Sequence, residues 1–171
     1  MTTSYQESFI SPIGTMRVCA NDKAIESIHF IEPASDIAPY RNDPVDVCVR
    51  IGSDNVNALT SNAIDQLIEY FNKKRTTFDL PLGASGTEFQ QRVWNALNDI
   101  PYGQTYSYGD IAKQIDNPKG MRAVGLANGK NPLTIVVPCH RVIGANGKLT
   151  GYASGTERKS WLLNHEMGSL F

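Results

Sequence analysis

The sequence predicts an α+β fold of two domains, and three observations support this prediction. Strand-like segments with alternating apolar residues fill the first 31 residues, and an amphipathic helix pattern follows. Beyond residue 86, apolar residues recur at helical spacing in several short segments, two of which open with a capping residue. The glycine-rich segment 83–86 separates the two regions, so we place one domain at residues 1–83 and the other at 84–171.

Composition sets limits on the environment of this 171-residue chain. It has no run of about 18 apolar residues, and its first residues lack the basic and apolar regions of a signal peptide. The three cysteines, Cys19, Cys48 and Cys139, are widely spaced and odd in number, which predicts neither a disulfide framework nor a C-x-x-C metal pair. Cys19, Cys48 and His29 are too few for a four-ligand zinc site. We therefore expect a protein of the reducing cytoplasm without membrane segments.

Charge is distributed unevenly along a chain whose net charge is −1. Residues from 84 onward carry a net charge of +3, and the residues before them carry −4. An acidic first half beside a mildly basic second half suggests that the second half meets an anionic partner. Ordinary surface scatter explains the same split about as well.

The first domain is expected to contain strands and one helix. Residues 8–20 have the pattern of a hairpin, with a Ser-Pro-Ile-Gly turn at 11–14, and residues 24–31 alternate like a third strand. Residues 32–54 are polar with several prolines, which predicts a loop. A helix is predicted over 57–74 and an edge strand over 78–82, and the apolar face of that helix is Ile64, Leu67, Ile68 and Phe71.

The second domain is expected to contain a helix-turn-helix. A first helix begins at Thr87, whose spacing to Gln90 is that of a capping box. Two short helices, 108–114 and 121–127, are joined by a turn that contains Pro118 and Gly120. Small residues on the second of them, Ala123, Gly125 and Ala127, would let it approach a DNA groove closely. A plain helical hairpin remains the alternative to DNA binding.

The best candidate for chemistry is Cys139, in the sequence Pro-Cys-His-Arg-Val. The apolar run 133–137 predicts a short buried strand that ends at Pro138, and a glycine-rich loop follows at 143–153. A free thiol with a pKa of about 8.5 needs a neighbouring base or cation to become a nucleophile. His140 is the adjacent base, and Glu166, on a final helix that starts at Thr156, is the carboxylate that could orient it. An inert buried cysteine is the alternative.

The segment 135–143, IVVPCHRVI, resembles the signature of the O6-alkylguanine-DNA alkyltransferases, also called methylated-DNA–protein-cysteine methyltransferases. The resemblance extends over 87–166, through Arg122-Ala123-Val124-Gly125, Asn131-Pro132, the segment 151–155 and the segment 161–166. The first half resembles the family's N-terminal domain in layout only. The resemblance implies an α+β protein with a small ribonuclease-H-like α/β domain and a mainly helical domain with the helix-turn-helix. Chain length and organisation most resemble the constitutive bacterial form.

The resemblance also implies a mechanism: a single irreversible transfer that uses no cofactor. Cys139, linked through water to His140 and then Glu166, would accept an alkyl group from the guanine oxygen, and O4-alkylthymine is a second candidate substrate. Tyr108 would donate a proton toward guanine N3, so that a neutral base leaves. Because the thioether is not hydrolysed, each molecule would react once.

Substrate binding is implied in the same way. The partner is double-stranded DNA with an alkylated guanine, bound by a monomer through the minor groove, with no membrane involved. Arg122 would enter the base stack and fill the gap left by the flipped nucleotide. The remaining implied contacts are the DNA-facing Ala123, Gly125 and Ala127 and the pocket residues Asn131, Val142, Tyr152 and Ala153.

Two departures from the family pattern and three alternatives accompany this prediction. Ala153 stands where the family often has Ser, and the family's occasional zinc ligands are not all present, so we predict no metal. Non-catalytic alkyltransferase-like proteins, which bind lesions without repair, have Trp at the position of Cys139. A helix-turn-helix regulator with an inert cysteine would not need the Pro-Cys-His-Arg-Val segment, and a cysteine hydrolase would turn over repeatedly.

Overall fold

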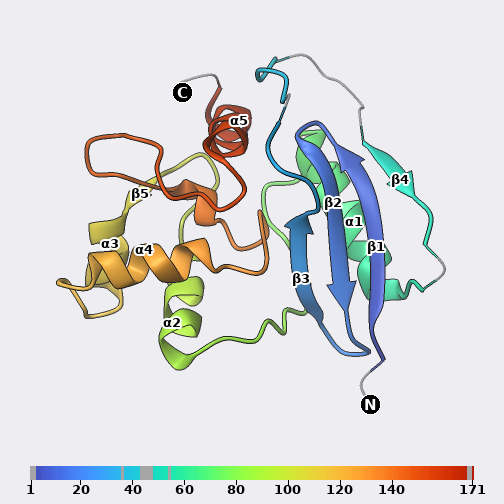
Figure 1. Cartoon of the computed structure of the whole chain (residues 1–171), viewed down its shortest axis with the longest axis horizontal. Coiled ribbons are helices and arrows are strands. Elements are labelled where there is room, and N and C mark those ends of the chain that lie inside the picture. Colours follow the sequence, from blue (N-terminus) through green and yellow to red (C-terminus); the bar gives the residue numbers. More distant parts are fainter. Residues whose placement is uncertain (1–2, 36, 43–47, 54, 169–170) are drawn as a thin grey trace. The chain divides into compact units, whose positions relative to one another are not determined.

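The computed structural model describes residues 3–35, 37–42, 48–53, 55–168 and 171. The chain divides into two compact units, Met1–Ser85 and Gly86–Phe171 (Figure 1). The first contains a sheet and one helix, and the second is mainly helical, so the predicted α+β class is confirmed. None of the helices in the described ranges combines the length and the apolar character needed to span a bilayer.

The first unit is built on a four-stranded sheet in the order β3-β2-β1-β4. Its strands are β1 (Tyr5–Ser11), β2 (Gly14–Ala20), β3 (Ile25–Phe30) and β4 (Val49–Ile51), and every neighbouring pair is antiparallel. Alternation of apolar residues along β1 and β2 gives the sheet one buried face, on which Phe9 pairs with Met16. Gly14, at φ 121°, permits the tight turn between β1 and β2.

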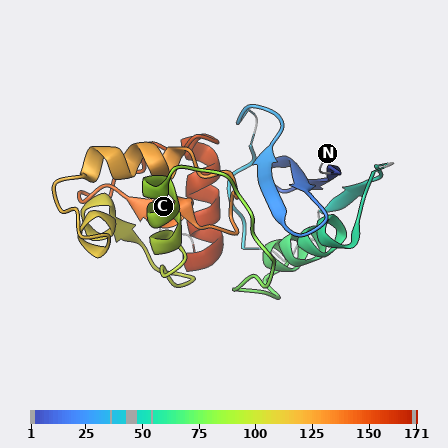
Figure 2. The same ribbon diagram turned by 90° about the horizontal axis from the view of Figure 1, so that it is seen from below.

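The helix α1 (Ala58–Phe71) covers the buried face of this sheet (Figure 2). Asn57 caps it: its side chain accepts from the Thr60 amide at 2.9 Å, and the Thr60 hydroxyl accepts from the Asn57 amide at 3.1 Å. Three residues of the apolar stripe predicted from the sequence, Ile64, Leu67 and Phe71, are buried, and Phe71 packs on Phe9 with ring centroids 6.3 Å apart.

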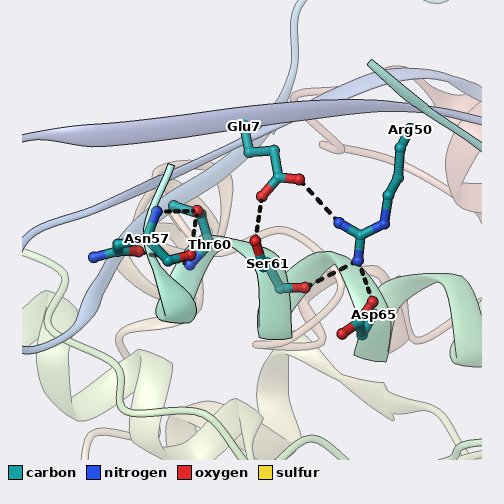
Figure 3. A network of polar contacts seen from close by, with 6 residues as sticks. All are labelled: Glu7, Arg50, Asn57, Thr60, Ser61 and Asp65. Carbon is teal, nitrogen blue, oxygen red and sulfur yellow. Dashed lines mark hydrogen bonds and ion pairs between the residues drawn. The ribbon is translucent and has the colours of Figure 1, made fainter. Parts of the chain in front are cut away.

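A polar network fixes the short strand β4 to β1 and α1 (Figure 3). The carboxylate of Glu7, a buried residue of β1, accepts from Arg50 Nη1 at 2.9 Å and from Ser61 Oγ at 3.1 Å. Arg50 Nη2 also donates to the Ser61 carbonyl at 3.2 Å and forms an ion pair with Asp65. A carboxylate so buried needs such partners, because unpaired burial of a charge is costly.

The outcome for the first unit is mixed at the level of individual elements. The hairpin, the third strand and the helix lie where the sequence predicts them, although α1 ends at Phe71 instead of Lys74. The edge strand predicted over 78–82 is wrong, since the structure has only an isolated bridge there, between Ile25 and Leu82. In the stretch predicted as a loop, 32–54, β4 was missed, and residues 36, 43–47 and 54 of that stretch lie outside the described residues.

The second unit packs its helices around the segment that contains Cys139. Capping boxes open α2 (Glu88–Leu97) and α3 (Tyr108–Gln114), and α4 (Met121–Gly129) lies against both helices (Figure 1). The indole nitrogen of Trp94 donates to the Ala127 carbonyl at 2.9 Å and so joins α2 to α4. The remaining elements are β5 (Tyr106–Ser107), the 3₁₀ turn η1 (Cys139–Arg141), β6 (Val142–Ile143) and α5 (Thr156–Met167).

The run 133–137 is buried, but the prediction of a strand there is wrong. Thr134 and Val137 form an isolated bridge within a tight turn, in which the Val137 amide donates to the Leu133 carbonyl at 2.9 Å. Ile135 has φ 72°, a left-handed conformation that ends any extended strand. Strand pairing near the cysteine occurs instead after it, where β6 runs parallel to β5.

Candidate active site

Cys139 lies at the start of η1, directly after Pro138, and its residue is 5% exposed. Its amide donates to the Val137 carbonyl at 2.8 Å, and its carbonyl accepts from Asn128 Nδ2 at 3.4 Å. Burial raises the pKa of the thiol, while a hydrogen bond from Asn131 and the charge of Lys159 act to lower that pKa. The thiol is therefore held in a fixed main-chain frame, with groups beside it that favour the thiolate.

His140 and Glu166 form a buried pair at this turn. His140 Nε2 lies 2.7 Å from Glu166 Oε2, and both side chains are fully buried. Burial lowers the pKa of His140. Burial acts in the opposite direction on Glu166, but His140 and Arg141 outweigh it and hold the pKa of that carboxyl well below its ordinary value. The imidazole is accordingly neutral with Nε2–H donating to a carboxylate, an assignment that leaves Nδ1 as the acceptor.

The free ring nitrogen of His140 points to a further contact. Nδ1 is buried and has no hydrogen-bond partner among the described residues. Buried polar atoms almost always have a partner, either protein or water. This nitrogen is therefore available to receive a proton from a neighbour of the ring.

Arg141 completes the polar cluster, and sequence reasoning assigned it no role. Arg141 Nε donates to Glu166 Oε1 at 2.7 Å and Nη2 to Oε2 at 3.2 Å, while Nη1 donates to the Ile100 carbonyl at 2.8 Å. Two-point binding fixes the carboxylate plane, so that Oε2 stays directed at His140.

Asn131 braces the turn that leads to the cysteine. Its Nδ2 donates to the Val137 carbonyl at 2.8 Å, and its Oδ1 accepts from the Leu133 amide at 3.0 Å. Both bonds span the segment in which Ile135 takes its left-handed conformation. A short side-chain amide that satisfies two main-chain groups in this way stabilises the turn.

The expected pocket residues border the loop 144–155. The Tyr108 hydroxyl donates to the Thr150 carbonyl at 3.0 Å, and burial raises the pKa of this half-buried phenol. Tyr152 is buried, which raises the pKa of its phenol well above the ordinary value, and Val142 is buried too. Ala153 lies exposed on the same loop as Tyr152.

The helix α4 presents only part of the predicted DNA-facing set to solvent. Arg122 and Ala123 are exposed, and Gly125 is half-buried under the Tyr108 ring, where an added Cβ would lie 3.9 Å from two ring carbons. Ala127 is 3% exposed, so its side chain belongs to the core of the second unit, and this burial counts against the predicted contact with DNA. The exposed position beside it is Leu126, at 67% exposure.

Lys159 is the other site residue that sequence reasoning missed. It lies on α5 two turns before Glu166 and is fully buried, with Nζ donating to the Thr150 carbonyl at 3.1 Å and to the Val142 carbonyl. The spacing of seven residues from Glu166 places both side chains on one helix face, and this was the available signal. Within the described residues, no group of three or more His, Cys, Asp and Glu side chains could hold a metal ion.

Comparisons with known proteins identify relatives of both units. Residues 4–84 match the family model described as 6-O-methylguanine DNA methyltransferase, ribonuclease-like domain, and residues 88–168 match the model of its DNA binding domain. A methylated-DNA–protein-cysteine methyltransferase of Mycobacterium tuberculosis strain H37Rv is 62% identical over 160 residues, which cover 91% of this chain and 88% of that protein. Its namesake from Methanosarcina acetivorans is 47% identical over 162 residues, or 95% and 97% of the two chains.

Solved structures resemble the whole chain as well. The crystal structure of the Mycobacterium tuberculosis O6-methylguanine methyltransferase superimposes with a TM-score of 0.78 at 44% identity, covering 96% of this chain and 93% of that one. A crystal structure described as Mycobacterium tuberculosis OGT in complex with DNA gives a TM-score of 0.77 at 44% identity, over 95% and 92% of the two chains.

Proposed function

This chain belongs to the 6-O-methylguanine DNA methyltransferase family, and from that membership we propose that it repairs alkylated DNA by direct reversal. It transfers the alkyl group of O6-alkylguanine to Cys139 in a single irreversible reaction. The observation on which this rests is the buried thiol at the start of η1. It is next in sequence to His140, which pairs with Glu166 and whose Nδ1 has no hydrogen-bond partner among the described residues.

The proton of the thiol leaves through His140. Its Nδ1, without a protein partner among the described residues, supports a bridging water that links it to the sulfur. Glu166 stabilises the imidazolium that forms, and Arg141 keeps Glu166 ionised. Sγ then attacks the alkyl carbon, a C–S bond forms, and the C–O6 bond breaks with its electron pair passing to the guanine.

Tyr108 supplies the proton that the leaving base requires. Its phenol stays protonated at neutral pH, because burial raises its pKa. Donation toward guanine N3 lets a neutral base leave, and the proton lost by the thiol restores the phenol, so no net charge is created. The product is a thioether and unmodified guanine.

The base is held in a pocket formed around the turn and the loop. Main-chain groups of Cys139 and Val142 bind its edge, Asn131 supports the turn, and Tyr152 and Ala153 line the side next to the O6 substituent. Because residue 153 is alanine and has no hydroxyl, its main-chain N–H is the donor that this position can offer to the O6 atom.

The DNA partner is bound as a duplex, and α4 enters its minor groove. Arg122 is exposed and forms no ion pair among those of the described residues, which leaves its guanidinium available for the gap in the base stack. Ala123 and Gly125 permit close approach of the helix. We place this reaction in the cytoplasm, carried out by a monomer.

A non-catalytic lesion-binding protein is the main alternative, and intact-mass measurement distinguishes the two. Incubation with a duplex that contains O6-methylguanine is expected to add one methyl group per molecule, located on the peptide with Cys139 and abolished by Cys139→Ser. Binding without a mass gain would indicate the lesion-binding alternative, and continued release of product beyond one equivalent would indicate a hydrolase.

A further inference from the structure

Lys159 is buried in the second unit without a carboxylate partner. None of the ion pairs found among the described residues includes it, and Glu166, seven residues later on α5, is already bound to His140 and Arg141. Lysine is almost never fully buried unless its charge is paired. The ammonium of Lys159 therefore needs an anionic partner, and its direct protein contacts do not supply one while Cys139 is a neutral thiol.

The contacts of its ammonium join three parts of the site. Nζ donates to the carbonyl of Val142, the residue that caps η1, and to that of Thr150 in the loop 144–155. The Thr150 carbonyl also accepts from the Tyr108 hydroxyl, and Nζ lies 5.9 Å from the centre of the Tyr108 ring. One side chain thus connects the cysteine turn, the loop and the first residue of α3.

The anion that completes this arrangement is the thiolate of Cys139. Lys159 and Cys139 act on each other electrostatically, and Val142, which accepts from Nζ, is three residues from Cys139. A thiolate carries its charge only until the sulfur is alkylated, so the ammonium stabilises the reactive state and gains nothing from the thioether.

We propose that Lys159 is a positioning residue of the alkyl transfer, which ties the turn of Cys139 to the loop 144–155 and provides the positive charge that the thiolate requires. This inference rests on the proposed function. Lys159 transfers no proton: the thiol proton leaves through His140, the C–S bond forms, and the C–O6 bond breaks as described above.

Because Lys159 titrates, its effect on Cys139 should depend on pH. Burial lowers its pKa to about 8, and the charge of Cys139 acts to raise it. The titratable groups that face it are Cys139 and His140 from η1 and Tyr108 from α3, with pKa values raised, lowered and raised, respectively. Because deprotonation removes the ammonium charge, its support for the thiolate declines above a pH of about 8.

The test compares Lys159→Met and Lys159→Arg with the wild-type protein between pH 6 and 10 (a range of about two units on either side of the expected Lys159 pKa). Iodoacetamide labelling, followed on the Cys139 peptide by mass spectrometry, reports thiolate formation without DNA. Single-turnover methyl transfer from an O6-methylguanine duplex reports the reaction itself. Lys74→Met, at an exposed lysine of the first unit, is the matched control for loss of one charge.

We expect Lys159→Met to slow iodoacetamide labelling of Cys139 at pH 7, where the ammonium is charged, about 10-fold to 1,000-fold, because loss of a neighbouring positive charge raises the pKa of a thiol by about one to three units. Methyl transfer at neutral pH should slow about tenfold or more. Lys159→Arg should keep the wild-type labelling rate at pH 7, and its methyl-transfer rate should not decline above a pH of about 8, since arginine stays charged. Lys74→Met should match the wild type.

An unchanged labelling rate at pH 7 in a folded Lys159→Met protein would overturn the inference. If that variant does not unfold cooperatively, Lys159→Arg provides the test. A methyl-transfer rate that still declines above a pH of about 8 contradicts a role for Lys159, and a rate that no longer declines supports one. If the wild-type protein accepts no methyl group, the proposed function fails, while the labelling rates at pH 7 still test the charge of Lys159 separately.

Discussion

Glu166 shows how one residue in the site joins stability to chemistry. Its carboxylate lies in a fully buried position, yet it is held ionised by Arg141 on one side and His140 on the other. Removal of one member of a buried ionic cluster is costly, because the partners stay buried without their counter-charge. The same carboxylate orients the imidazole, so a single substitution should affect both folding and reactivity.

Glu166→Gln should lower the free energy of unfolding at pH 7 by about 3–5 kcal/mol. The depressed pKa of Glu166 stabilises the folded state above the unfolded-state pKa of about 4.3, and this stabilisation is lost as the pH falls below it. His140, whose pKa is lowered, likewise destabilises the fold as the pH falls below about 6.5. Urea unfolding from pH 7 downward, to below the pKa of about 4.3 of an unfolded glutamate, measures both effects.

The difference in the free energy of unfolding between Glu166→Gln and the wild type should therefore become smaller below a pH of about 4.3. Glu157→Gln, at an exposed position in the first turn of the same helix, should cost less than about 1 kcal/mol. A constant difference across the whole pH range would contradict the ionised state assigned to Glu166.

Tyr108→Phe tests proton donation at a second residue. The phenylalanine ring keeps the packing against Gly125 and removes only the hydroxyl, whose acceptor, the Thr150 carbonyl, still receives Lys159. Single-turnover methyl transfer should slow by about 100-fold or more, since general acid catalysis contributes at least that much. Affinity for the lesion duplex, measured in a Cys139→Ser background, should stay unchanged, and a defect confined to binding would contradict the assignment.

At the residue scale, reasoning from sequence placed Cys139, His140 and Glu166 in one site but passed over Arg141 and Lys159. The first three belong to residue types with a known chemical use in nucleophilic catalysis. From sequence alone, a lysine or arginine is predicted to lie at the surface, because most residues of these types are exposed. Only the packing of α5 against η1 reveals that two such side chains are buried.

At the scale of elements, the clearest limit of the sequence was the run 133–137. A short apolar segment next to a proline is compatible with a buried strand and with a buried turn, and periodicity does not separate them. The turn depends on Ile135 at φ 72°, on Asn131 and on the core around them, and none of these is local information. Strands as short as β4, β5 and β6, with two or three residues each, are equally hard to recognise.

The longer elements were predictable because each had its own local signal. Asn57, Thr87 and Ser107 all form the reciprocal bonds of a capping box, and the helices they open begin as the sequence indicates. The helix-turn-helix pattern of α3 and α4 was also visible. What the pattern of small residues did not reveal was which of them face outward: Ala127 is buried, and the exposed Leu126 was overlooked.

Arg122→Ala tests the role of α4 as the element that opens the duplex. Flipping a base costs a few kcal/mol, and the inserted Arg122 side chain would offset part of this cost. Loss of about 1.4 kcal/mol of that stabilisation slows a reaction tenfold. Methyl transfer from an O6-methylguanine duplex should therefore slow about tenfold or more, whereas reaction with the free base should be unchanged. Lys113→Ala, at an exposed position on α3, controls for general loss of positive charge. Equal losses on both substrates would remove the assigned role.

At the scale of the whole molecule, the two units differ in net charge and in the family model that each one matches. Net positive charge lies in the half from residue 84 onward, and the match to a DNA binding domain covers 88–168. All the residues to which we assign chemistry lie in this second unit. The first unit matches a ribonuclease-like domain, and its polar network of Glu7, Arg50, Ser61 and Asp65 serves the packing of its own sheet.

The alkylated protein should be less stable than the unreacted one. Cys139 is 5% exposed within a braced turn, so a methyl group on its sulfur must displace packed neighbours, which costs about 1–3 kcal/mol. For a chain of this size, we expect the midpoint of thermal unfolding to fall by about 2–12 °C.

The measurement is calorimetry of the protein before and after complete reaction with a methylated duplex, with DNA removed in both samples. Cys139→Ser taken through the same incubation is the control and should keep one midpoint throughout. An alkylated protein that unfolds at the same temperature as the unreacted protein, or higher, would mean that the turn around Cys139 accommodates the new group without strain. The reaction would then not lower the stability of the fold, contrary to what the close packing around the thiol predicts.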